Sequence, residues 1–200
     1  MNPRPNIIFE RVPSAYEAGG VRYEADTSHR CGVRCALLLE DPAVDERLKP
    51  LLVARNVLDP AIRTHALPER ALTKDAVEWC LWFHTCGMGP DGGRRGRSSA
   101  RSFSFDDDAE RIVADFQAVY GIDLTDPAVE VHWWRFMALL RALDGDTAVG
   151  TAVRIRRAEP EKGMSDKQRR ALREAKEAVR LTPRTLDEAK AAENEMWGVG

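Results

Sequence analysis

The 200-residue sequence lacks any apolar run long enough to cross a membrane. Its longest apolar runs, such as residues 36–39 and 136–140, fall far short of the roughly 20 residues that span a bilayer. No apolar segment follows the N-terminal residues 1–5, so the sequence shows no secretory signal. We therefore expect a protein that stays in a reducing cytosol and has no membrane partner.

Cysteine is scarce, and none of the four cysteines belongs to a CxxC pair. In a reducing cytosol, Cys31, Cys35, Cys80 and Cys86 are expected to be free, buried thiols. Together with His84 they can be drawn as a zinc site, because zinc takes four such ligands in a tetrahedron. The aromatic and aliphatic residues around Cys80 favour core thiols instead, and we predict no metal and no cofactor.

A motif for nucleophilic catalysis is also missing. No G-x-S-x-G turn is present, and only His84 and His132 are histidines near a predicted core. A histidine beside two tryptophans, as His132 is, more often anchors a helix through a hydrogen bond than acts as a general base. The aspartates at 106–108 lack the ligand spacing of an EF-hand, which favours the charged start of a helix. We predict that the protein is not an enzyme.

The charge of the chain is small but uneven. Net charge is −2, which gives no overall attraction to nucleic acid. Residues 102–130 carry eight acidic residues and one basic residue, whereas residues 154–190 carry twelve basic and seven acidic residues. The glycine and arginine-rich residues 87–101 are predicted to form a mobile basic loop. That loop has no interleaved aromatic residues for stacking bases, so we do not expect nucleic acid as a partner.

What the sequence does contain is ample material for a globular core, with 44% hydrophobic and 31% charged residues. Two β-rich stretches, 7–12 and 21–24, predict a small N-terminal hairpin. Helical spacing begins at Ser28. A second helix is predicted from Asp41 and Pro42, as an N-cap followed by proline. Its buried face is expected to hold Val44, Leu48, Leu51 and Leu52.

Further capping signals divide the remainder of the chain into helices. Thr73 is predicted to cap a helix that stops at residues 86–87. Ser104 with Asp107 is predicted to begin a helix that holds the aspartates 106–108 in its first turn and apolar residues from Ala109 to Tyr120. Gly121 and Ile122 have the pattern of a Schellman stop. Asp126 and Pro127 predict the start of a helix over residues 129–143 that is apolar almost all round, and so is either central or offers one face to a partner.

The last part of the chain is predicted to be charged and helical. Residues 148–153 fit a short amphipathic helix or an edge strand. Ser165 with Gln168, and Thr185 with Glu188, predict two solvated helices, the second ending near Trp197. The fold class expected is therefore mainly α, with a helical domain at 1–157 that includes the hairpin and the loop at 87–101. A charged helical tail is expected at 158–200.

An ordered series of residues with regular spacing runs from 104 to 156. Its members are Phe105, Asp106, Asp108, Ala109, Ile112, Phe116, Tyr120, Gly121, Ile122, Asp123, Leu124, His132, Trp133, Trp134, Arg135, Phe136, Ala138, Leu139, Leu140, Ile155 and Arg156. This series resembles a family of tailed-phage proteins encoded between the major tail protein and the tape-measure protein, usually described as tail assembly chaperones. Weaker similarity extends back through Trp82, Phe83, Cys86 and Gly87 to Tyr23, Asp26 and Thr27.

The resemblance implies a non-enzymatic protein in the cytoplasm of the infected bacterial host. Such a protein would bind the apolar, helical tape-measure protein and keep it soluble during tail morphogenesis, with a companion chaperone or further copies of itself as other partners. A structural virion component that forms rings, and a small nucleic-acid-binding regulator, are the alternatives. Aromatic side chains are the candidate partner-binding residues, because one core face cannot hold them all. They are Trp133, Trp134, Phe136, Tyr120 and Trp82.

Overall fold

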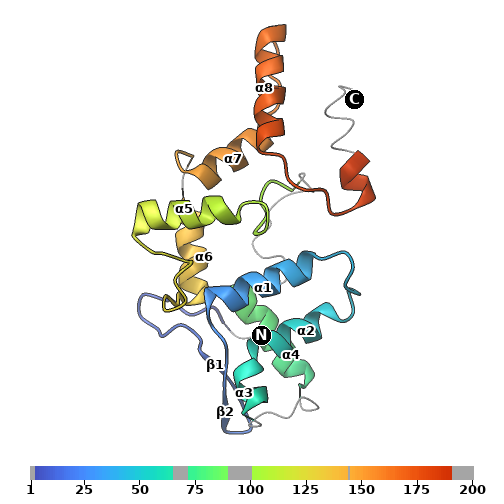
Figure 1. Cartoon of the computed structure of the whole chain (residues 1–200). Helices are drawn as coiled ribbons and strands as arrows, with labels where there is room; N and C mark the ends of the chain where they lie inside the picture. The colour runs from blue at the N-terminus through green and yellow to red at the C-terminus, as the bar shows by residue number, and fades with distance from the viewer. Residues whose placement is uncertain (1–2, 65–71, 90–100, 144, 191–200) are drawn as a thin grey trace. The chain divides into compact units, whose positions relative to one another are not determined.

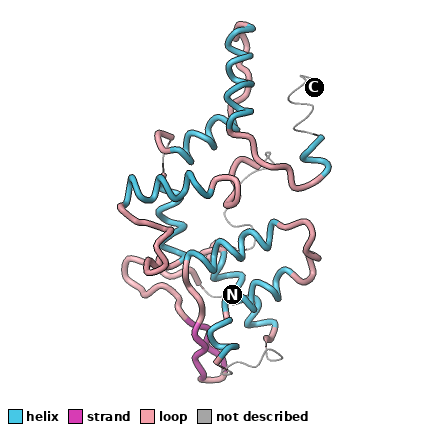
Figure 2. Tube along the Cα trace, in the orientation of Figure 1, coloured by secondary structure: helices cyan, strands magenta, loops and turns pink. Residues whose placement is uncertain are grey.

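The computed structural model describes residues 3–64, 72–89, 101–143 and 145–190. It confirms a mainly α fold with one small N-terminal hairpin (Figures 1 and 2). The chain forms two compact units: unit 1 comprises residues 1–98 and 130–139, and unit 2 comprises residues 99–129 and 140–200. Residue 157, the predicted domain boundary, therefore falls inside unit 2. Among the described helices, none is both long enough and apolar enough to cross a membrane.

The hairpin of unit 1 is displaced from its predicted position. Strand β1, Ala15–Ala18, pairs antiparallel with β2, Val21–Glu24, and the turn uses Gly19 and Gly20 at positive φ. The second strand was predicted correctly, but residues 7–12 do not form the first. Instead residues 6–10 form a turn, in which the backbone N–H groups of Phe9 and Glu10 donate to the Asn6 carbonyl. These two N–H groups are therefore not available for pairing with another strand.

Helix α1, His29–Glu40, begins where it was predicted. Ser28 is the N-cap, and its hydroxyl oxygen accepts a hydrogen bond from the Cys31 N–H. One face of the helix is buried, and that face includes two of the four cysteines. All four cysteines are buried, as expected for core thiols. The buried residues of α1 are His29, Cys31, Gly32, Cys35 and Ala36.

The helix predicted from Asp41 starts eight residues later, so that prediction was wrong. Asp41 ends α1, and its carboxylate accepts the Ala43 N–H at 2.8 Å, which closes a turn. Helix α2 is Lys49–Val57, followed by the short α3, Asp59–Arg63. The predicted buried face is also wrong, because Leu48 and Leu51 are 51% and 44% exposed. The buried residues of α2 are Lys49, Val53, Ala54 and Val57.

Two helices bring most of the aromatic residues of unit 1 into its core. Helix α4, Lys74–His84, is capped by Thr73 as predicted, and the chain leaves it through Cys86 and Gly87 at positive φ. Most of the predicted loop at 87–101 lies outside the described residues. Helix α6, Trp133–Ala142, starts seven residues after Asp126, because residues 131–133 first pair with residues 27–29 around an isolated bridge between Ser28 and His132.

Among the described residues, unit 2 contains the helices α5, α7 and α8, and several of their ends were predicted. Helix α5, Ala109–Tyr120, begins after a turn at 105–108 and not directly after Ser104. It ends at Gly121 as predicted, where Gly121 adopts φ 64° and its N–H donates to Gln117 O. This is the αL form of helix stop, because the Ile122 N–H donates to Phe116 O and not to Gln117 O as in the predicted Schellman motif. The segment left open between helix and strand is a helix, α7, Ala148–Arg157. Helix α8, Asp166–Ala178, has the predicted capping box and no buried residue. Residues 186–190 are also helical, whereas the predicted end near Trp197 lies outside the described residues.

Candidate functional site

Three of the five predicted partner-binding side chains form the core of unit 1. Trp133, Trp134 and Phe136 are only 1–3% exposed. The indole N–H of Trp133 donates to the His84 carbonyl and that of Trp134 to the Phe83 carbonyl, both at 2.8 Å. These two carbonyls lie at the C-terminal end of α4, where helix carbonyls lack intrahelical partners. In this conformation the two tryptophans therefore serve their own chain, and contact with a partner stays a prediction.

A glycine lets α1 approach this aromatic cluster closely. A Cβ atom built on Gly32 would lie 2.0 Å from Cε3 of Trp133, far inside any real contact. The Trp133 ring stacks with two other rings: its centroid lies 5.3 Å from that of His84 and 5.6 Å from that of Phe136. The close approach requires a residue without a side chain at position 32. The Trp133 ring is therefore held by contacts with the three helices α1, α4 and α6.

The other two predicted residues are partly exposed. Trp82 packs against Trp79 and Trp134, with ring centroids 6.3 and 5.4 Å away, and its indole Nε1 is buried without a hydrogen-bond partner among the described residues. Tyr120 belongs to unit 2 and packs edge-on against Phe116 at 5.5 Å. Because part of each side chain stays accessible, Trp82 and Tyr120 remain the better placed of the five to meet a partner.

His132 and His84 hold segments of unit 1 together through hydrogen bonds. His132 Nε2 lies 2.9 Å from the Pro13 carbonyl, and its Nδ1 accepts the Trp134 N–H at 3.2 Å. Burial lowers the pKa of His132, although the bond to Pro13 opposes that shift. His84 Nε2 lies 3.2 Å from the Gly32 carbonyl, and burial lowers its pKa too. Both rings are thus held in the neutral form, and both nitrogens of His132 are occupied.

Two of the buried thiols in this core, Cys35 and Cys80, are held in the unreactive form. Cys31 and Cys35 share a hydrogen bond that raises the pKa of Cys35, reinforced by burial, and lowers that of Cys31. Burial also raises the pKa of Cys80. A thiolate is the form of cysteine that attacks or binds metals, so Cys35 and Cys80 are held in the inert form. Among the described residues, no three His, Cys, Asp or Glu side chains are grouped so as to hold a metal ion.

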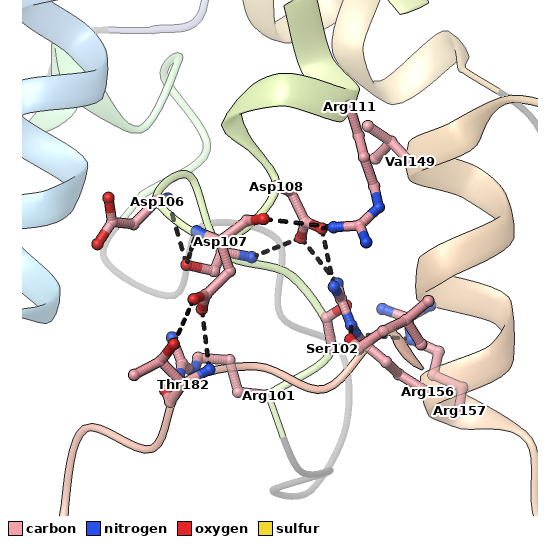
Figure 3. Close-up of polar contacts among 12 residues, drawn as sticks. Arg101, Ser102, Asp106, Asp107, Asp108, Arg111, Val149, Arg156, Arg157 and Thr182 are labelled. Carbon is pink, nitrogen blue, oxygen red and sulfur yellow. Dashed lines mark hydrogen bonds and ion pairs between the residues drawn. The ribbon is translucent and has the colours of Figure 1, made fainter. Parts of the chain in front are cut away.

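Unit 2 has a buried ion pair at its centre, which the sequence analysis missed. Asp108 is fully buried, and its carboxylate accepts two hydrogen bonds from Arg156 at 2.7 and 2.8 Å (Figure 3). Arg111 Nη1 approaches the same carboxylate at 3.1 Å, and the Ser104 N–H donates to it at 3.1 Å. Charge and hydrogen-bonding capacity are therefore satisfied within unit 2, as a buried carboxylate requires.

A second buried carboxylate ties the same two helices together. Asp115 lies on α5 and accepts the N–H groups of Ala148 and Val149 at 3.0 and 2.8 Å, at the first turn of α7. A negative charge at a helix N-terminus is favourable, because the unpaired N–H groups there carry partial positive charge. Asp108 and Asp115 are seven residues apart, so they share one face of a helix. This i, i+7 spacing on the face of Ile112 was the signal in the sequence that pointed to the pair.

The C-terminal part of unit 2 returns to the start of α5. Thr182 donates to the carboxylate of Asp107 through its hydroxyl at 2.6 Å and through its backbone N–H at 3.2 Å (Figure 3). Burial raises the pKa of Asp107, but the hydrogen bonds from Thr182 and Ser104 and the positive charge of Arg101 together outweigh it and leave the pKa below its ordinary value. The three aspartates are thus not a uniform charged helix start, because Asp107 and Asp108 hold other segments in place.

An open depression in unit 1 is lined partly by residues that cap α1. It has a volume of about 420 Å³ and lies beside the residues that join β2 to α1. Asp26 accepts from the N–H and hydroxyl of Ser28 and from Arg34, so this carboxylate serves the N-terminal cap of α1. The hydroxyl oxygen of Ser28 accepts the Cys31 N–H, so the pair of Ser28 and Asp26 belongs to the same cap.

The fold and these contacts define a mainly helical protein of two compact units, each stabilised by its own polar and aromatic contacts. A family model described as Bacteriophage Gp15 protein matches residues 8–181 of the chain. The chain therefore belongs to the bacteriophage Gp15 protein family. No curated protein and no solved structure matches the chain.

Proposed function

We propose that this protein is a non-enzymatic tail assembly chaperone, which binds the tape-measure protein of its phage and keeps it soluble while the tail is built. Membership of a bacteriophage protein family is the observation that carries the proposal. The matched residues 8–181 include the whole of the series from Phe105 to Arg156 that resembles tail assembly chaperones. The site of action is the cytoplasm of the infected host, where tails assemble.

The described structure supports a binding role in two ways. The titratable residues that chemistry would need are used to hold helices and turns, as in the contacts of Asp108, Asp115 and His132. Several large apolar side chains are also exposed in both units, and exposed apolar surface favours contact with another apolar molecule. These side chains are Ile7, Ile8, Phe9, Val21, Leu48, Leu51, Val119 and Leu186.

The tape-measure protein is a long helical client, and a helix presents apolar side chains three and four residues apart. Trp82 and Tyr120 are suited to such a client because each combines a large ring with partial exposure. The indole N–H of Trp82 is buried without a hydrogen-bond partner among the described residues, so the accessible part of the ring is what a client would contact. The proposal therefore places client contact at these two residues before the buried Trp133 and Trp134.

Co-expression with the tape-measure protein of the same genome tests the proposal. We expect a soluble complex that elutes together from a sizing column, and we expect Trp82→Ala and Tyr120→Ala to release client. Trp82→Phe keeps a smaller aromatic ring and is expected to retain more client than Trp82→Ala. A client that stays insoluble beside folded wild-type protein contradicts the proposal. Closed rings of this protein alone, with no client bound, favour a structural virion component instead.

A further inference from the structure

The turn formed by residues 6–10 presents an apolar knob, defined here as Ile7, Ile8 and Phe9. Ile8 is 83% exposed and Phe9 85%, the two most exposed large apolar side chains described. Four hydrogen bonds close the turn beneath them. Asn6 accepts from Phe9 and Glu10 through its carbonyl and from Ile8 through its side chain, and its own N–H donates to the Glu10 carboxylate at 2.9 Å. The apolar side chains are thus displayed by a formed turn.

The same unit carries a second exposed apolar surface, an acceptor patch formed by Leu48 and Leu51. They are 51% and 44% exposed and lie three residues apart, so they are neighbours at the start of α2. The buried face of this helix is formed by other residues, including Val53, Ala54 and Val57. About half of each leucine is open to solvent, so this apolar surface is available to a partner outside the unit.

The charges around the two surfaces are opposite. Residues 3–11, which hold the knob, carry two arginines and one glutamate. Residues 40–51, which include the patch, carry four carboxylates, one arginine and one lysine. Arg4 and Arg11 are exposed beside the knob. Beside the patch, Asp45 and Glu46 are paired with Arg47 and Lys49 of the same segment, which leaves two more carboxylates than cations there, the exposed Asp41 among them. Opposite charge around two apolar surfaces favours their association and disfavours contact of either surface with its own kind.

The two surfaces lie apart on unit 1. In Figure 1 the segment before β1 and the connection from α1 to α2 stand on opposite sides of this unit. We propose that the apolar knob of one copy docks on the acceptor patch of a second copy of this chain. The contact joins two different surfaces, so it is head-to-tail, and each added copy leaves a free knob and a free patch. The contact is small, so association is weak and depends on concentration.

Sedimentation velocity of the full chain, without any client, tests this proposal and does not depend on the proposed function. The wild-type sedimentation coefficient is expected to rise with protein concentration. Ile8→Ser with Phe9→Ser, and Leu48→Ser with Leu51→Ser, are each expected to weaken association by at least about tenfold, because each removes one of the two surfaces. Circular dichroism checks folding, and Phe9→Ala and Leu51→Ala serve as milder variants if a double variant unfolds.

Mixing the two double variants gives the decisive result. The knob variant keeps its patch and the patch variant keeps its knob, so a mixture is expected to form one-to-one pairs and no larger species. A wild-type protein that stays monomeric at all concentrations overturns the proposal. So does a mixture that fails to pair while the wild type associates, or a patch variant that associates as strongly as the wild type, since that indicates knob-to-knob contact.

Discussion

The two units of this chain are stabilised in different ways. Unit 1 packs helices around Trp133. Its polar groups often satisfy helix ends, as where the indole N–H groups of Trp133 and Trp134 donate to the carbonyls of His84 and Phe83 at the end of α4. Unit 2 instead joins α5 to α7 through two buried carboxylates, Asp108 and Asp115. Packed rings are sensitive to changes of volume, whereas a buried ion pair is sensitive to the loss of one partner. The comparison predicts which substitutions each unit tolerates.

The largest effect is expected for Asp108→Ala. It leaves Arg156, whose side chain is 7% exposed, without its carboxylate, and breaking a buried pair in this way costs about 3–5 kcal/mol of unfolding free energy. Urea denaturation followed by far-UV circular dichroism measures the loss. Asp106→Ala removes an exposed neighbouring carboxylate and is the matched control, with a change within about 0.5 kcal/mol. Equal losses for both variants contradict the role given to Asp108.

Gly32→Ala is expected to cost unit 1 about 3 kcal/mol, because the new methyl group collides with the Trp133 ring. Tryptophan fluorescence reports this unit well, since four of the five tryptophans belong to it. Gly145→Ala is the control: the nearest atom to its added Cβ is 4.0 Å away, so unfolding should hardly change. A Gly32→Ala protein as stable as wild type shows that α1 does not approach Trp133 as described.

Acidification is expected to weaken unit 1. The pKa values of His84 and His132 are lowered in the folded state from the ordinary value of 6.5, so below about pH 6.5 the unfolded chain binds more protons than the folded one. Stability therefore falls as the pH falls through that range, and levels off once the folded histidines also protonate. Unfolding followed by fluorescence between pH 8 and pH 5.5 measures the slope. His132→Gln should reduce this slope. An unchanged slope would contradict the claim that folding holds His132 in its neutral form.

The smallest effect is expected for Thr182→Val, which removes the hydroxyl that binds Asp107. The contact is largely exposed, so its loss should cost less than about 1 kcal/mol. Amide hydrogen exchange of residues 180–185 is the sensitive measurement, because release of this segment is local. Thr182→Ser keeps the hydroxyl and should exchange like the wild type. Faster exchange in the serine variant as well would indicate that the methyl group, rather than the hydrogen bond, holds the segment.

The sequence predicted helix ends best where the signal is local. The caps at Thr73 and Ser165 and the stop at Gly121 depend on residues within one or two turns, and all three are present. Both Asp-Pro starts failed in the same way. The carboxylates of Asp41 and Asp126 each accept the backbone N–H two residues on, at 2.8 Å, which forms a turn rather than a cap. An aspartate before proline is typical of either structure, so the pattern alone does not decide.

The surroundings of the candidate site residues were harder to predict, because they come from distant parts of the chain. The burial of Trp133 depends on Gly32 and His84, about 100 and 50 residues away in sequence, which no helical periodicity reveals. The exposed Ile8 and Phe9 were assigned to a strand, since β-branched and aromatic residues favour strands. The pairing of Asp108 with Arg156 also spans 48 residues. Only the spacing of Asp108 and Asp115 was readable locally.

The most direct test of the chaperone proposal is aggregation of the tape-measure protein, diluted from denaturant into buffer and followed by light scattering. The account predicts that wild-type protein suppresses scattering in proportion to the copies added, until the client is saturated. Asp106→Ala should act like the wild type, because it changes only an exposed carboxylate. Scattering that is the same with and without folded protein, at many copies per client, would contradict the central claim.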